Sequence, residues 1–260
     1  MIDRGSGIPI VVIPGLHGRW EWTRPAVEAL SRRHRVIAFS LCDERTSPFP
    51  CDPDRAFENY LSQVSLALDR AGLDRAVIAG VSYGGLIAAE FAARQPDRVS
   101  ALVLASALHK SWAPNEEQQR YLKSPFLMSP MFVATSPGRM RPEIAAAMPG
   151  FGERIRFTAR QGARAVMSPT SPFRMARRIV WAKSHHFSDP KHVTAPALVV
   201  TGEPGLDRVV PVDVSRRYLD DLERAEHVVL KGTGHIGILT KPEAFAALLE
   251  RFVDGVRLSA

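Results

Sequence analysis

Residues 75–85 constrain the fold of this chain more than any other stretch. A short apolar run ends at Gly80, and Ser82 stands between Gly80 and Gly84. Residues 86–94 are rich in Ala and contain no Pro, which favours a helix. Where a strand turns sharply into a helix, the two backbones approach so closely that only small residues fit beside the apex. The stretch therefore predicts a nucleophile elbow with an exposed Ser82 hydroxyl, although a serine in an ordinary tight turn also fits this segment alone.

Short apolar runs alternate with helical patterns along most of the chain. We expect strands at residues 8–14, 36–40, 76–81, 99–105, 196–201 and 227–230. We expect helices at 22–33, 86–94, 211–222 and 242–256, and one that begins behind an N-cap at Asp52 and stops at Gly72. This alternation predicts an α/β fold with a mostly parallel sheet, right-handed crossovers and helices on both faces. A length of 260 residues suits one large domain, or a core with an inserted subdomain.

Residues 108–192 interrupt this alternation. They contain no strand-like run, only Pro-punctuated pieces with helical spacing, of which 155–167 and 173–185 are the longest. We call this segment the helical insertion, and we expect it to divide the core into residues 1–107 and 193–260. It holds 14 Lys and Arg against 5 Asp and Glu, whereas the rest of the chain holds 20 against 22. The basic excess of the protein, +7 in total, therefore lies in the helical insertion.

Composition excludes several classes of protein. Apolar residues make up 45% and charged residues 23%, as in ordinary globular proteins. No stretch approaches the roughly 20 apolar residues that span a bilayer, and residues 1–7 lack the layout of a signal peptide. No basic run is interleaved with aromatic residues. We therefore expect a cytoplasmic protein that binds neither membrane nor nucleic acid.

Two later segments supply partners for Ser82. Asp207 lies in the loop after the expected strand at 196–201, and His235 stands between glycines after the strand at 227–230. Acyl transfer by serine needs a base, an acid that orients the base, and donors for an oxyanion. A loop Asp alone is commonly a turn residue, but the order Ser, acid, His, each behind a strand, predicts a triad. Glu203, in the same loop as Asp207, is the alternative acid.

With these motifs the whole chain resembles the α/β-hydrolase superfamily. The resemblance is carried by the serine elbow, by the Gly-x-x-x-x-Asp-x-Val-Val-Pro loop at 202–211, and by the Gly-His segment with Lys-Pro-Glu-Ala-Phe at 241–245. It implies that Ser82, Asp207 and His235 are catalytic and that the backbone amides of Leu16 and Tyr83 form the oxyanion hole. It also implies that the helical insertion is a cap that roofs the site and shapes the substrate pocket.

The sequence departs from the family pattern at three places. Pro14 stands where the family often has His, which removes no donor because the Leu16 backbone supplies it. The few residues before Ile8 cannot form the usual N-terminal hairpin, so we expect a sheet of about six strands. Residues 41–47 replace the family's Asp-x-x-Gly-x-Gly-x-Ser loop, with no consequence that the sequence reveals.

The resemblance implies a serine hydrolase that cleaves a small ester, thioester or related carbonyl compound through an acyl-enzyme. The same triad serves C–C bond hydrolases, acyltransferases and perhydrolases, and the motifs do not separate them. A serine nucleophile argues against dehalogenase and epoxide-hydrolase chemistry, which the family performs with a carboxylate. A non-catalytic small-ligand receptor that keeps the triad is the alternative from another class.

The remaining polar clusters predict no cofactor or metal. Cys42 and Cys51 flank a Pro-rich loop, and we expect free thiols rather than a disulfide or a zinc site. His185, His186 and His192 have no neighbouring Cys or carboxylate set, so we interpret them as surface or hinge residues. The basic helical insertion raises the hypothesis of an anionic substrate; the alternative is that its Arg side chains extend into water. The oligomeric state stays open.

Overall fold

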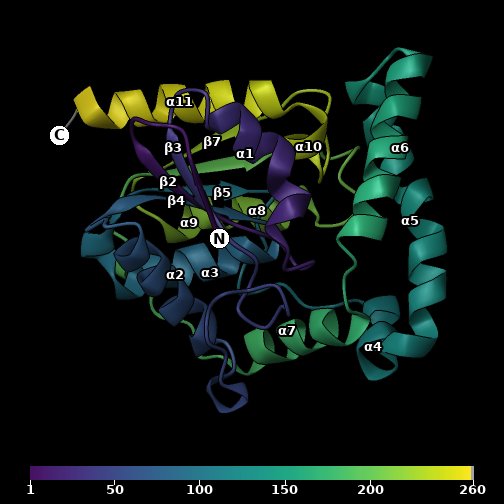
Figure 1. The fold of residues 1–260 in the computed structure, drawn as a ribbon, viewed down its shortest axis with the longest axis horizontal. Helices are drawn as coiled ribbons and strands as arrows, with labels where there is room; N and C mark the ends of the chain where they lie inside the picture. Colours follow the sequence, from purple (N-terminus) through teal and green to yellow (C-terminus); the bar gives the residue numbers. More distant parts are fainter. Residues whose placement is uncertain (259–260) are drawn as a thin grey trace.

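A seven-stranded sheet forms the centre of the molecule (Figure 1). The computed structural model describes the backbone of residues 1–258, and their side chains outside 128–137 and 257–258. The strands are β1 (Ile2–Arg4), β2 (Pro9–Ile13), β3 (Arg35–Ala38), β4 (Ala76–Val81), β5 (Val99–Ala105), β6 (Ala197–Thr201) and β7 (Ala225–Val229). Their order is β1-β3-β2-β4-β5-β6-β7, and every neighbouring pair is parallel except β1 with β3. The predicted α/β class is confirmed.

The seventh strand corrects the expected number of about six. β1 pairs antiparallel with β3, with Ile2 opposite Ala38, rather than with its sequence neighbour β2. Two hydrogen bonds of 3.1 and 2.7 Å from Arg35 to the Asp3 carboxylate fasten it to the edge. Gly5, at φ 79°, turns the chain from β1 towards β2, and a Cβ there would lie 2.2 Å from the His34 carbonyl oxygen. A short strand of this kind contains no apolar run, so the hydrophobic pattern of the sequence does not predict it.

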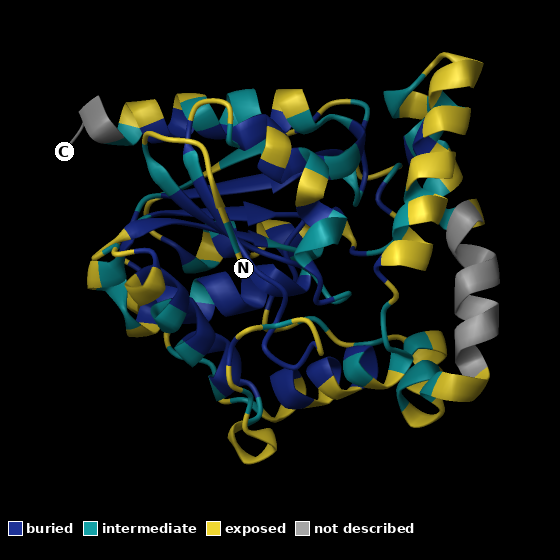
Figure 2. Cartoon of the chain, viewed as in Figure 1, coloured by how far each residue is buried: buried dark blue, intermediate teal, exposed yellow. Residues whose placement is uncertain are grey.

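Helices cover both faces of the sheet (Figure 1). On one face lie α1 (Arg24–Leu30), α10 (Gly237–Thr240) and α11 (Pro242–Leu258). On the other lie α2 (Glu58–Arg70), α3 (Tyr83–Arg94), α8 (Val212–Arg216) and α9 (Tyr218–Asp221). The core between these layers is buried (Figure 2), as parallel strands with near-continuous apolar sequence require.

Short 3-10 helices adjust several predicted boundaries. They are η1 (Trp20–Thr23), η2 (Pro53–Arg55), η3 (Pro96–Arg98) and η4 (Pro190–His192). Asp52 is an N-cap as expected, but its carboxylate accepts from the Asp54 N–H and caps η2 rather than α2. Ala56, with φ 45°, separates the two helices. The predicted helix at 211–222 is divided into α8 and α9.

Four helices between β5 and β6 form the helical insertion; in Figure 1 the last of them runs below the core and the others stand beside it. They are α4 (Glu116–Lys123), α5 (Pro125–Ala147), α6 (Phe151–Met167) and α7 (Pro172–Ser184). Asn115 and Gln118 form a capping box at the start of α4, and the Ser171 hydroxyl accepts from the Arg174 N–H at the start of α7. Within the described part of residues 108–192 no strand forms, as the sequence predicts.

A buried charge cluster fastens α7 to the core. The Arg178 side chain is fully buried, and its guanidinium donates to Asp43 Oδ1 at 2.8 Å and to Glu44 Oε1 at 2.6 Å. It also donates to the Leu16 carbonyl oxygen at 2.7 Å. Asp43 and Glu44 belong to the 41–47 segment that departs from the family pattern. That segment therefore supplies the carboxylates that hold the helical insertion.

Candidate active site

Ser82 occupies the strained turn between β4 and α3 that the sequence predicts. Its backbone has φ 53° and ψ −117°, a sparsely populated conformation that costs of order 1–3 kcal/mol. A Cβ at Gly80 would lie 2.3 Å from the Gly84 carbonyl oxygen, and one at Gly84 would lie 2.5 Å from the Ile13 carbonyl oxygen. Both glycines are therefore required by close backbone approach, which excludes the ordinary tight turn.

The three residues predicted as a triad lie in contact. His235 Nε2 is 3.1 Å from Ser82 Oγ, and His235 Nδ1 is 3.2 Å from Asp207 Oδ2. Asp207 Oδ1 accepts from the backbone N–H groups of Val209 and Val210, both at 2.9 Å, which leaves Oδ2 directed at the imidazole. Because a carboxylate can only accept, Nδ1 carries the proton and Nε2 is free to accept from the serine. This is the geometry that an activated serine nucleophile needs.

Glu203, the alternative acid, does not face the imidazole. Its Oε1 accepts from the Gly232 N–H at 2.7 Å, at the base of the loop that carries His235. Its role is to hold that loop, and Asp207 is the carboxylate bonded to His235.

The electrostatics of the pair favour a charged acid and a basic imidazole. Burial alone would raise the pKa of Asp207, but the His235 imidazole and the Val209 and Val210 amides bring it below its usual value. Burial alone would lower the pKa of His235, but the charge and hydrogen bond of Asp207, and next the carboxylate of Glu143, bring it above its usual value. Asp207 therefore stays ionised and stabilises an imidazolium.

The two residues predicted to supply oxyanion donors lie in the segments next to Ser82. A Cβ at Gly15 would lie 3.3 Å from Ser82 Cβ, which puts the loop carrying Leu16 beside the serine. Tyr83 is the first residue of α3, where backbone N–H groups have no acceptor within the helix. The Tyr83 side chain is buried, and its hydroxyl donates to the Arg178 carbonyl oxygen at 2.8 Å, so only its backbone borders the site.

The sequence patterns do not predict two residues that lie next to the triad. Glu143, on α5, accepts from the Ile236 N–H next to His235. Its one visible signal is that it is the single acid between Glu117 and Glu153. His17 stacks on Trp22 with ring centres 4.8 Å apart, and burial, with the nearby charges of Arg178 and His235, lowers its pKa to about 4. His17 is therefore neutral at physiological pH.

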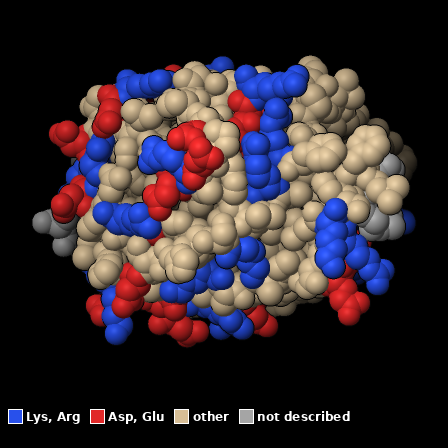
Figure 3. Space-filling view, turned by 90° about the horizontal axis from the view of Figure 1, so that it is seen from below, with Lys and Arg blue, Asp and Glu red and all other residues tan. Residues whose placement is uncertain are grey.

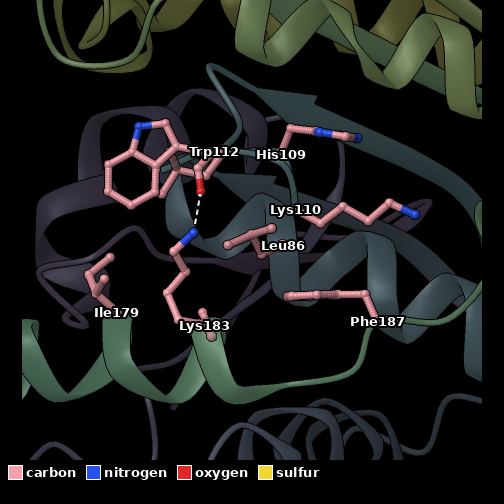
Figure 4. Close-up of a pocket in the computed structure, with 9 residues that line it drawn as sticks. Leu86, His109, Lys110, Trp112, Ile179, Lys183 and Phe187 are labelled. Carbon is pink, nitrogen blue, oxygen red and sulfur yellow. Dashed lines mark hydrogen bonds between the residues drawn. The ribbon is translucent and has the colours of Figure 1, made fainter. Parts of the chain in front are cut away.

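A second contact of Ser, His and Asp lies apart from this site. His109 Nε2 is 2.9 Å from Asp221 Oδ2, and His109 Nδ1 is 2.7 Å from Ser111 Oγ. Here the serine sits in an ordinary loop, and its Oγ also accepts from Arg217 at 2.7 Å. His109 lines a small hollow between this loop and α7, where Lys183 donates to the Trp112 carbonyl oxygen (Figure 4). None of Ser82, Asp207 and His235 lines this hollow.

The remaining predicted clusters have structural surroundings. His186 and His192 are exposed as expected, but the His185 side chain is only 7% exposed and lies 3.2 Å from Glu90, so its assignment to the surface was wrong. Cys42 and Cys51 are free thiols. Among the described residues, no three His, Cys, Asp or Glu side chains are grouped to hold a metal ion. None of the helices described is both long and apolar enough to cross a membrane.

Comparisons with known proteins identify the fold family of the chain. The family described as alpha/beta hydrolase fold matches residues 8–242. The chain is 27% identical to a 2-hydroxy-6-oxo-2,4-heptadienoate hydrolase of Pseudomonas putida, over 96% of this chain and 91% of that protein. It is 24% identical to Methylesterase 7 of Arabidopsis thaliana, over 97% and 99%. The structure of an enol-lactonase from Burkholderia xenovorans superposes with a TM-score of 0.78 at 21% identity, over 97% of this chain and 95% of that one.

Proposed function

Because the chain belongs to the α/β-hydrolase fold family, we propose that it cleaves a small ester, thioester or related carbonyl compound through Ser82, His235 and Asp207. Family membership and whole-length similarity to enzymes named hydrolase and methylesterase make it a hydrolase. The single observation that carries the proposed residues is the chain of contacts from Asp207 through His235 to a serine in strained backbone geometry.

In the proposed mechanism, His235 Nε2 removes the Ser82 hydroxyl proton as the oxygen attacks the carbonyl carbon. The backbone amides of Leu16 and Tyr83 donate to the oxyanion of the tetrahedral intermediate. The imidazolium, stabilised by Asp207, then protonates the leaving group. Water, deprotonated by His235, attacks the acyl-enzyme and releases the acid and the free serine.

We further propose that the helical insertion, residues 108–192, acts as the cap between core segments 1–107 and 193–260. Two contacts support this role: Glu143 on α5 reaches the residue after His235, and Arg178 on α7 reaches the Leu16 carbonyl. Helices of the insertion thus touch both loops that border Ser82.

The two free thiols fit a cytoplasmic location, which cell fractionation tests.

A C–C bond hydrolase that uses the same triad is the second candidate. Similarity over 96% of the chain to the Pseudomonas putida enzyme named for a heptadienoate favours it. A dienoate carries a carboxylate, which an unpaired cation would recognise. The best-placed guanidinium, that of Arg178, is already bonded to Asp43, Glu44 and the Leu16 carbonyl. We therefore place the neutral ester first.

The test is turnover of a p-nitrophenyl ester by the wild type, Ser82→Ala and a matched control, Ser111→Ala. We expect Ser82→Ala to lose turnover to the background level with its fold intact, because the nucleophile is absent, while Ser111→Ala keeps it. Near-normal turnover by Ser82→Ala would refute the assignment. No turnover of any ester by the wild type would refute the ester hydrolase and leave the C–C bond hydrolase and the non-catalytic receptor as the candidates.

The same assay separates the substrate classes when it compares a neutral ester with its carboxylate-bearing analogue across ionic strength. We expect the neutral ester to react at least as fast, with little dependence on salt. A faster anionic ester whose advantage disappears at high salt would support the anionic substrate instead.

A further inference from the structure

Glu143 is a buried carboxylate that the proposed mechanism does not use. Its side chain projects from α5 and is 1% exposed. Its two oxygens, Oε1 and Oε2, accept from the Ile236 N–H at 3.0 and 3.1 Å. A Cβ at Gly234 would lie 2.8 Å from Glu143 Oε2. The carboxylate therefore lies against both residues that flank His235.

We infer that Glu143 is a positioning residue, which holds the 234–236 segment so that the His235 imidazole stays within reach of Ser82. The inference rests on the proposed function, since it assigns a part in that same site. It gives the helical insertion a second task beside covering the site: one of its helices completes the support of the catalytic base.

The loop around His235 needs such support because it is rich in glycine. Gly232, Gly234 and Gly237 allow many backbone conformations, so fixing the loop costs more entropy than fixing other residues. Glu203 holds one end of the loop at the Gly232 N–H, from the core. Glu143 holds the other end at the Ile236 N–H, from 93 residues away in sequence. His235 lies between these two anchors.

Charge gives Glu143 a second effect on the imidazole. The titratable groups that face His235 are Asp207 from the loop after β6, Glu143 from α5 and His17 from the loop after β2. Because His17 is neutral, it adds no charge beside the imidazole. The two carboxylates both raise the pKa of His235 against the effect of burial. Burial raises the pKa of Glu143 itself, while the Ile236 and Gly234 amides and then the His235 charge oppose that rise.

Glu143 is not an alternative member of the triad. Its hydrogen bonds go to backbone amides, whereas the imidazole Nδ1 bonds to Asp207. Its effect on the reaction must therefore pass through the position and the charge of His235. A change in the pH profile and in kcat, with KM nearly constant, is the signature of that route.

The experiment compares Glu143→Gln with a matched control, Glu153→Gln, an exposed carboxylate on the neighbouring helix α6. Glutamine keeps the shape but removes the charge and one acceptor. We expect kcat for the p-nitrophenyl ester to fall by about tenfold with KM nearly unchanged, because the base is less well placed. We also expect the acid limb of kcat/KM to move to lower pH, since the imidazole loses a stabilising negative charge. The control should change neither quantity.

A second variant separates the effect of the Glu143 charge from that of its length, and a second measurement follows His235 without turnover. Glu143→Asp keeps the charge but is shorter, so it should lower kcat while moving the acid limb less than Glu143→Gln does. Titration of the His235 imidazole by NMR needs no turnover, and the Glu143→Gln variant should titrate at lower pH than the wild type. An active wild type whose kcat, acid limb and imidazole titration are all unaffected by these substitutions overturns the inference and leaves the proposed function standing. An inactive wild type whose His235 titration still shifts refutes the proposed function alone.

Discussion

At the scale of single residues, the site depends on the different hydrogen-bond partners of the two Asp207 carboxylate oxygens. Oδ1 is occupied by the Val209 and Val210 amides, and Oδ2 faces His235. In Asp207→Asn those two backbone donors would keep the amide oxygen at Oδ1, which turns the NH₂ group towards the imidazole. The imidazole would then accept at Nδ1 and carry its proton on Nε2, the nitrogen that must accept from Ser82.

We therefore expect Asp207→Asn to lose kcat by about 10⁴-fold, the size of the effect of the same change in a serine protease triad. Glu203→Gln is the control, because its oxygen can still accept from the Gly232 N–H. Steady-state kinetics of both variants check this. A large loss in Glu203→Gln together with a small one in Asp207→Asn would mean that the other acid serves His235.

The sequence contains enough to find Ser82, Asp207 and His235, because each stands in a local pattern behind a strand. It does not reveal Glu143, whose partner is a backbone amide. Backbone donors leave no trace in the residue types, so the contact exists only through the way α5 packs on the loop. His185 was misjudged for a related reason: its partner Glu90 lies on α3, far away in sequence.

At the scale of elements, a buried ion cluster is one of the contacts that attach the helical insertion to the core. Arg178 from α7 lies between Asp43 and Glu44, whose side chains are 0% and 3% exposed. Arg174 and Arg177 add contacts of 3.3 and 3.2 Å to the same two carboxylates. Removal of the central guanidinium would leave buried carboxylates with weaker partners.

Arg178→Met should lower the free energy of unfolding by about 3–5 kcal/mol, the usual cost of breaking a buried pair. Arg156→Met, on the exposed surface of α6, should change it by less than about 0.5 kcal/mol. Urea unfolding of the two variants measures both values. Equal stability of the two would mean that the cluster does not hold α7 to the core.

The elements themselves were largely predictable, because apolar periodicity identifies six strands and the helices of the core. β1 was not, since its three residues show no apolar run and gain their place only by pairing with β3. The structural role of residues 41–47 could not be predicted either, because the arginines with which they pair follow more than 120 residues later.

At the scale of the whole molecule, the uneven charge of the sequence is partly neutralised in the fold. Three arginines of the basic helical insertion pair with Asp43 and Glu44 of the core. On the face seen from below, Lys and Arg are interspersed with Asp and Glu rather than gathered in one field (Figure 3). The net charge of +7 is therefore weak support for an anionic substrate.

We propose that the fold activates one serine among all those in the chain. Covalent labelling by a fluorophosphonate probe, with the modified residue located by peptide mass spectrometry, tests this proposal. We expect a single adduct on Ser82, which is absent in Ser82→Ala and forms much more slowly in His235→Ala, because the imidazole is the base that accepts the Ser82 proton. Labelling at another serine, or none in a correctly folded wild type, would contradict it.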